Sequence, residues 1–271
     1  RKTLGQSSMS ALLYARIKQD YEFKGQPPVM LLDAAGPYGK EVFSVAADSP
    51  DPNVSQLFTR TGYKDSFQPQ LQALGQLAAD ENWVMENAAK KLTDEEIKEL
   101  QQEIQTLYFT EYIQTWDSVL DRMQIAPFKD LNTATRRLKF LSGESSPFVV
   151  LAQRVFEETS LATGAKVLDN GVASGSVIAG AADRLGKMLG AQQQDKLVDQ
   201  LMGPERTVDK HYEGLHQFFK ANDASSTPAK DTQTLINGVY KEFDLLSSGL
   251  LNDADTRLSG LFDSDQILQL Q

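Results

Sequence analysis

The feature that most constrains this chain is a long amphipathic pattern that begins with a clear helix start signal. Thr93-Asp94-Glu95-Glu96 reads as a capping box, in which the Thr93 hydroxyl accepts from an early backbone N–H and Glu96 reaches back to the Thr93 N–H. Apolar residues then recur at helical spacing as far as Met123. A helix of about 30 residues is roughly 45 Å long, which predicts the central rod of an elongated molecule.

The apolar stripe on this predicted helix changes face along its length. At about 100° per residue, the apolar residues of 97–108 cluster on one side, and those of 109–123 centre about a quarter-turn away. One flat partner does not cover both arcs, so we expect different neighbours along the helix, as in the middle of a bundle. Two interpretations of its aromatic residues stay open, namely core packing or an exposed stripe that binds a partner; these residues are Tyr108, Tyr112 and Trp116.

Helical spacing also recurs in most of the remaining chain. Residues 29–32 are the exception, because they read as a short strand or a buried segment, and turn signals surround them. The predicted class is therefore mainly all-α, an elongated multi-helix bundle with little or no β structure. Glycine, proline and capping residues bound the other helical segments, which are 7–23, Pro69 to Val84, 130–143, 147–156, 208–219, 235–246 and a further candidate at 250–271.

A change in composition divides the chain. Residues 163–190 are rich in glycine, alanine and serine, as is typical of a linker or a loosely packed helix pair. We therefore predict a helical subdomain at 1–162, a linker or loose segment at 163–204 and a second helical subdomain at 205–271. The chain starts without an initiator methionine and stops on apolar residues without a helix cap, so we expect a segment of a longer protein.

Composition and charge exclude several classes of function. The 271 residues carry a formal net charge of −10, which argues against a nucleic-acid binder and against a polybasic membrane anchor. The sequence has no cysteine, so disulfides, thiolate metal sites and cysteine nucleophiles are excluded. No run of 18 apolar residues occurs, so we expect no membrane span within these residues.

The sequence patterns that would indicate a metal, phosphate-binding or catalytic site are incomplete in this chain. His211 and His216 stand about 140° apart on a helix, too far to bind one metal ion from a single face. A calcium-loop pattern fails at Arg257, where an oxygen ligand is needed, and a phosphate-loop interpretation of Gly186-Lys187 fails on spacing and on Met188. No pair of carboxylates stands out either. We therefore expect no catalytic residue, no cofactor and no metal site.

Several short segments, taken in order, resemble the TssM family, also called IcmF, of the type VI secretion system. The matching segments are 57–63 followed by 67–69, 81–84, 107–117, 141–147 with Glu158-Thr159 behind it, and, more weakly, 208–212. Two departures are that Met85-Glu86 stands where the family usually has Leu-Gly, and that residues 161–205 carry no recognisable motif. The motif positions expected to have a structural role are Phe58, Gly62, Tyr63, Trp83, Tyr112, Trp116, Pro127, Leu141, Ser142, Ser146, Pro147, Glu158 and Thr159.

The resemblance implies a structural function. Members of the family anchor in the bacterial inner membrane, extend a periplasmic part toward the outer membrane, and assemble with inner-membrane TssL and the outer-membrane lipoprotein TssJ. It implies that this chain is periplasmic, non-enzymatic and self-associating, with the family's nucleotide-binding-like region before it and a β-rich region beyond Gln271. Two rivals stay open: a soluble helical adaptor that grips a peptide or helix in a groove, and a cell-wall enzyme with two catalytic carboxylates.

Overall fold

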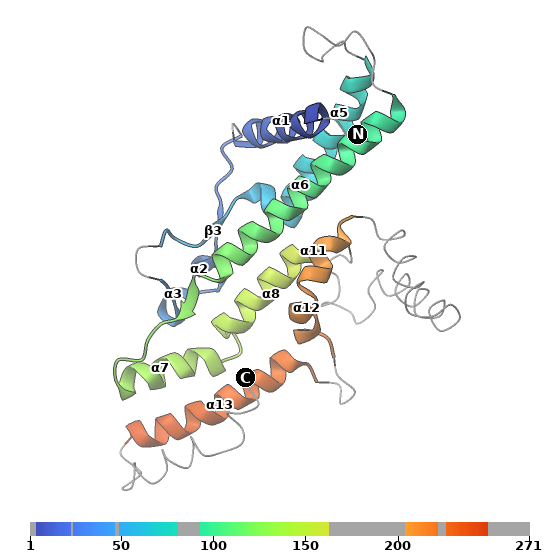
Figure 1. Ribbon diagram of the computed structural model, residues 1–271. Helices are drawn as coiled ribbons and strands as arrows, with labels where there is room; N and C mark the ends of the chain where they lie inside the picture. Colours follow the sequence, from blue (N-terminus) through green and yellow to red (C-terminus); the bar gives the residue numbers. More distant parts are fainter. Residues whose placement is uncertain are drawn as a thin grey trace, which may run out of the picture.

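A single long helix organises the fold. The computed structural model describes residues 4–22, 24–46, 49–80, 93–162, 204–221 and 226–248, and in it α6 (Asp94–Leu120) runs for 27 residues through an elongated arrangement of helices (Figure 1). The predicted capping box forms, because the Thr93 hydroxyl accepts from Glu96 N at 3.2 Å and the Glu96 carboxylate accepts from Thr93 N at 2.8 Å. This box satisfies two of the backbone N–H groups that every helix start leaves unpaired.

The end of α6 corrects one expectation. The helix stops at Leu120 rather than near Met123, because the next residues pair with a distant strand. Strand β4 (Met123–Ile125) is antiparallel to β2 (Phe43–Val45), with Ser44 opposite Gln124. A second two-stranded antiparallel sheet pairs β1 (Val29–Met30) with β3 (Asn53–Val54). These short sheets tie the connections between helices, and the fold is mainly helical, as predicted.

Different elements cover α6 along its length. Helix α1 (Leu4–Glu22) lies against it, where Lys18 Nζ pairs with the Glu111 carboxylate at 2.9 Å, and α5 (Gln68–Asp80) packs against its first half. Helix α8 (Pro147–Thr159) and the short α11 (Arg206–His211) lie along its second half (Figure 1). The change of neighbours explains the change of face in the sequence pattern. Leu107 is one exception to that pattern, because its side chain is exposed.

Helices α7 and α13 form a pair at one end of the molecule (Figure 1). They are α7 (Leu131–Ser142), which Asp130 caps by accepting from Thr133 N at 2.7 Å, and α13 (Pro228–Ser247). The Thr135 hydroxyl donates to Phe243 O, and Gln233 donates to Gly143 O, so the two helices are antiparallel. Helix α12 (Glu213–Phe218) links this pair to α8.

Short helical turns lie among and after the first three strands. The short helices α2 (Leu31–Ala34) and α3 (Gly39–Val42) stand between β1 and β2. The turns that build the functional region follow β3, and they are a 3₁₀ turn η1 (Gln56–Phe58), one helical turn α4 (Arg60–Gly62) and a π-helical turn η2 (Tyr63–Phe67) that runs directly into α5. Such π turns insert an extra residue and occur frequently at functional sites. Here the turn places Tyr63 and Phe67 against α6.

One core joins residues on both sides of the predicted linker. Val208 and Tyr212 are buried in the same apolar cluster as α1, α6 and α8. A smaller cluster of Phe156, Phe219 and Ala229 joins α8 to α12 and α13. Except for Pro204, the predicted linker at 163–204 lies outside the described residues, as do Trp83 and the candidate helix at 250–271.

Candidate functional site

Three aromatic side chains on successive turns of α6 form the centre of the candidate site, which we call the helix brace. Tyr108, Tyr112 and Trp116 are all fully buried, which confirms core packing and excludes the exposed stripe. Each also donates a hydrogen bond to a backbone carbonyl that lies far away in the sequence. The three bonds are Tyr108 OH to Leu57 O (2.7 Å), Trp116 Nε1 to Phe58 O (2.8 Å) and Tyr112 OH to Glu158 O (2.7 Å).

These bonds determine where α6 lies against its neighbours. Two of them hold the 3₁₀ turn η1, and the third holds the end of α8. A buried carbonyl that loses its only donor costs about 1–3 kcal/mol, so sliding α6 by one turn would leave several such groups unpaired. The brace therefore fixes the axial position of α6 as well as its burial.

Aromatic rings from the π turn complete the apolar part of the brace. The Phe67 ring stacks on Tyr108 with centroids 3.8 Å apart and an interplanar angle of 14°. The ring centroid of Tyr63 lies 5.7 Å from that of Tyr108. The Tyr63 hydroxyl donates to the Glu205 carboxylate and accepts from Gln68 Nε2 at 2.9 Å. Burial raises the pKa of Tyr63, and the neighbouring Glu205 raises it further. The hydroxyl therefore stays a donor, and it links η2 to the residue before α11.

Gly62 is required by the close approach of backbone at this turn. A Cβ atom added there would lie 1.9 Å from the Gln56 carbonyl oxygen, which is an impossible contact with main chain. The fully buried Thr59 holds the same turn, because its hydroxyl accepts from Gly62 N at 3.0 Å and donates to Gln56 O at 2.7 Å. The Leu-Phe-Thr-Arg-Thr-Gly run in the sequence is therefore explained by one compact capped turn.

Glu158, on α8, contacts this turn through its side chain and α6 through its backbone carbonyl. Its side chain is only 8% exposed; one carboxylate oxygen accepts from Arg60 N at 2.7 Å, and the other pairs with the Arg154 guanidinium at 2.7 Å. Its backbone carbonyl is the acceptor for Tyr112. A buried carboxylate needs such compensation, and here an ion pair and a backbone donor supply it.

The end of α8 is held from the other side by α11 and α12. Asp209 Oδ1 accepts from Leu161 N at 2.7 Å and from Ala162 N at 3.1 Å, which satisfies backbone donors just after the helix. His216 Nε2 lies 3.1 Å from the Thr159 hydroxyl, whose proton is directed to Val155 O. Burial lowers the pKa of His216, while the acidic Asp209 and Glu213 oppose that shift.

A further link joins α11 to the second half of α6. Asp117 accepts from the Tyr212 hydroxyl at 2.7 Å, and its other oxygen lies 2.9 Å from His211 Nε2. Burial is the main cause that raises the pKa of Tyr212, with Asp117 adding to it. The two histidines therefore point to different partners, His211 toward α6 and His216 toward α8. They also lie on two short helices, α11 and α12, rather than on the single predicted helix 208–219.

The structure brings together seven of the thirteen predicted motif positions in the brace. These are Phe58, Gly62, Tyr63, Tyr112, Trp116, Glu158 and Thr159. Leu141 and Pro147 are buried elsewhere, Ser142 donates to Lys139 O, Pro127 is exposed, and Trp83 lies outside the described residues. The Ser146-Pro147 pair in the sequence predicts a capping hydroxyl followed by proline at the first helical position, and Ser146 does stand at the N-cap of α8. Its buried hydroxyl forms no hydrogen bond in the described part of the chain, so the prediction of a hydroxyl cap was wrong.

Sequence reasoning missed the acidic members of the brace, Glu205, Asp209 and Asp117, as functional positions. Asp209 carried a usable signal, because it precedes Tyr212 by three residues and so falls on the apolar side of its helix. Among the described residues, no group of three or more histidine or acidic side chains is placed to hold a metal ion. No described helix is both long enough and apolar enough to cross a membrane.

The fold and the brace together define a mainly helical structural domain, in which buried side-chain to backbone bonds fix the positions of the helices. Residues 1–160 match the protein family described as "IcmF-related: Intracellular multiplication and human macrophage-killing". The chain belongs to this IcmF-related family, and the resemblance seen in the sequence is confirmed.

Two relatives extend this comparison. The chain is 26% identical over 270 residues to the type VI secretion system component TssM1 of Pseudomonas aeruginosa, which covers 96% of this chain and 24% of that protein. A solved structure titled "Type VI secretion system membrane core complex" matches 89% of this chain and 37% of the solved one, with a TM-score of 0.56 and 15% identity. The chain thus spans less than half the length of either relative, and the solved structure supports the fold.

Proposed function

We propose that this chain is a structural scaffold of the type VI secretion membrane complex, a segment of a larger TssM protein. The support is its membership of the IcmF-related family and its likeness, over 96% of its length, to a protein named as a component of that secretion system. The single structural observation that carries the proposal is the helix brace. Its polar groups are spent on backbone acceptors and ion pairs within the fold, which is the arrangement of a rigid support.

The physical argument concerns length and stiffness. A helix of 27 residues spans about 40 Å, comparable to a bilayer with its headgroups. A long helix alone bends and frays, and its stability depends mostly on tertiary packing. The brace fixes α6 at three successive turns, so the element that gives length is also held in place. Such a rod transmits position between partners bound at its two ends.

The finer proposal places this segment in the periplasm, between the inner and outer membranes. In it, protein-protein contacts with inner-membrane TssL, with the outer-membrane lipoprotein TssJ and with further copies of the same protein form the complex. The chain acts there without a cofactor or a chemical reaction. The net charge of −10 argues against a polybasic attachment to anionic lipid, and it supports protein surfaces as the proposed means of assembly.

Site-specific crosslinking in living cells tests this proposal. A photoreactive amino acid is placed in full-length TssM at exposed apolar positions on α1, in the connection between β4 and α7, and on α13, namely Leu12, Phe128 and Leu245. We expect covalent adducts with TssJ, TssL or a second copy, and none when the same residue replaces exposed Gln114 on the solvent side of α6. Adducts only with a soluble protein, in cells whose membrane complex assembles normally, would instead support the adaptor.

Labelling with a membrane-impermeant maleimide tests the compartment. Because these 271 residues contain no cysteine, a single Gln114→Cys substitution gives one reporter thiol in a parent protein cleared of other cysteines. We expect labelling once the outer membrane is permeabilised and the inner membrane is intact. Labelling that requires lysis of the inner membrane would contradict a periplasmic position.

A further inference from the structure

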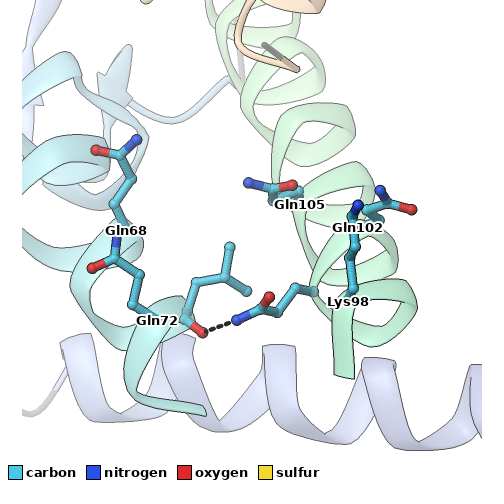
Figure 2. Close-up of a pocket in the computed structure, with 7 residues that line it drawn as sticks. Gln68, Gln72, Lys98, Gln102 and Gln105 are labelled. Atoms are coloured by element: carbon cyan, nitrogen blue, oxygen red, sulfur yellow. Dashed lines mark hydrogen bonds between the residues drawn. The ribbon is translucent and has the colours of Figure 1, made fainter. Parts of the chain in front are cut away.

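A groove with a polar lining lies beside the brace, between α5 and the first half of α6. It has a volume of about 250 Å³ and one wall on each helix (Figure 2). Five of the seven lining residues are glutamines, whereas ligand pockets are ordinarily lined mainly by apolar groups. The lining consists of Gln68, Leu71 and Gln72 on α5, and of Lys98, Gln101, Gln102 and Gln105 on α6.

The fold uses two of these glutamines and leaves the others available. Gln101 Nε2 donates to Leu71 O at 3.1 Å, which ties one wall to the other (Figure 2), and Gln68 Nε2 donates to Tyr63 OH at 2.9 Å. The groove therefore keeps its width, because both walls are anchored to the brace region. Within the described part of the chain, hydrogen bonds or ion pairs are absent from the side chains of Gln72, Gln102, Gln105 and Lys98.

Available primary amides match the backbone of a peptide. Each glutamine amide offers two N–H donors and a carbonyl acceptor in one plane, and a peptide bond offers the complementary acceptor and donor in the same plane. The spacing also fits. Gln102 follows Lys98 by four residues, as Gln72 follows Gln68, so the side chains that line each wall recur every ~6 Å along its helix. In an extended peptide every second residue faces the same side, at a spacing of ~6.7 Å. Two successive side chains of a wall can therefore contact two successive residues on that side of the peptide.

The charge of the lining restricts the peptide further. Lys98 is the only charged residue among the seven that line the groove, and a molecule with a net charge of −10 surrounds it. A single carboxylate near Lys98 is attracted at short range, whereas a strongly acidic peptide is repelled by the whole molecule. None of the seven described lining residues is aromatic, so they offer no stacking face of the kind on which sugars commonly rest.

We propose that this groove binds an extended, polar segment of a partner protein, with one acidic side chain against Lys98 and its backbone against Gln72, Gln102 and Gln105. The amides pair with the backbone of the segment, and Lys98 sets its register. This site is separate from the brace, and it adds a peptide-recognition surface to the scaffold. Leu71 is the one apolar residue among the seven described lining residues, whereas an amphipathic helix needs a wider apolar surface to bind. This also favours an extended strand of protein as the occupant.

The probe is a fluorescent, end-capped heptapeptide of alternating serine and glutamine with a central glutamate, titrated against the 271-residue chain by anisotropy. We expect saturable binding, and an otherwise identical peptide with a central glutamine binds several-fold more weakly. The double variant Gln102→Ala and Gln105→Ala weakens binding about tenfold, as the loss of two hydrogen bonds predicts. Lys98→Glu reverses the preference between the two peptides.

Matched controls separate the groove from general effects. Gln114→Ala lies on the same helix outside the groove and leaves the dissociation constant unchanged. Far-ultraviolet circular dichroism confirms that every variant is folded, as expected for substitutions at exposed or half-buried positions. The proposal is overturned by absence of saturable binding, by equal binding to the double variant, or by oligosaccharides binding there while peptides do not. None of these results changes the crosslinking test of assembly, which uses other surfaces.

Discussion

Replacing Trp116 tests whether the brace is a structural core or a surface for partners. The side chain is fully buried on α6, and its indole N–H donates to Phe58 O at 2.8 Å. Trp116→Ala removes both the ring and the donor, so it opens a cavity and leaves a carbonyl unpaired. Trp116→Phe keeps most of the ring and removes the donor, so it isolates the hydrogen bond.

The two variants are expected to lose different amounts of unfolding free energy. Truncating a fully buried tryptophan to alanine costs about 3–5 kcal/mol of unfolding free energy. Losing the donor to one buried carbonyl costs about 1–3 kcal/mol, which is the expected range for Trp116→Phe together with a small loss of packing. For a domain of this size, each 1 kcal/mol lowers the melting temperature by about 2–4 °C. The alanine variant should therefore melt roughly 6–20 °C lower.

The assay is urea unfolding followed by far-ultraviolet circular dichroism, because tryptophan fluorescence would change when one of only two tryptophans is removed. Leu12→Ala is the matched control, since Leu12 is a large apolar residue that is 59% exposed and should change stability by less than about 0.5 kcal/mol. One result would refute the reasoning. If Trp116→Ala left stability unchanged while assembly of the membrane complex failed, Trp116 would be an interface residue.

Three further predictions test separate parts of the brace. Tyr112→Phe removes only the hydroxyl that donates to the end of α8, so urea unfolding should show a loss of about 1–3 kcal/mol with an unchanged fold. Gly62→Ala forces a methyl group against Gln56 O and should destabilise by at least about 2 kcal/mol, measured the same way. Because the folded pKa of His216 is lowered, stability should fall as pH drops from 7 toward that pKa, and His216→Gln should flatten this dependence in melting curves between pH 7 and 5.

The sequence was sufficient to predict the long helix and its burial because the signals involved are local. The capping box depends on residues three apart, and both of its hydrogen bonds form. The shift of the apolar stripe depends on a fixed angle per residue, and the buried residues follow it through Trp116 and Val119. The end of α6 was misplaced for the opposite reason. Met123 fits the helical spacing, but it pairs with Val45, a strand residue far away in the sequence.

The brace itself was harder to predict because its acceptors are mostly backbone carbonyls. Tyrosine and tryptophan are recognised as hydrogen-bond donors from the sequence, whereas every residue has a backbone carbonyl. The sequence therefore does not show that Phe58 O and Glu158 O are the acceptors. These pairs are 58 and 46 residues apart, and only the tertiary fold brings them together. A motif position can therefore be required for where its backbone lies. Phe58 illustrates this, since its ring packs against Tyr112 while its carbonyl holds Trp116, and a substitution that kept the ring but moved the turn would still break the brace.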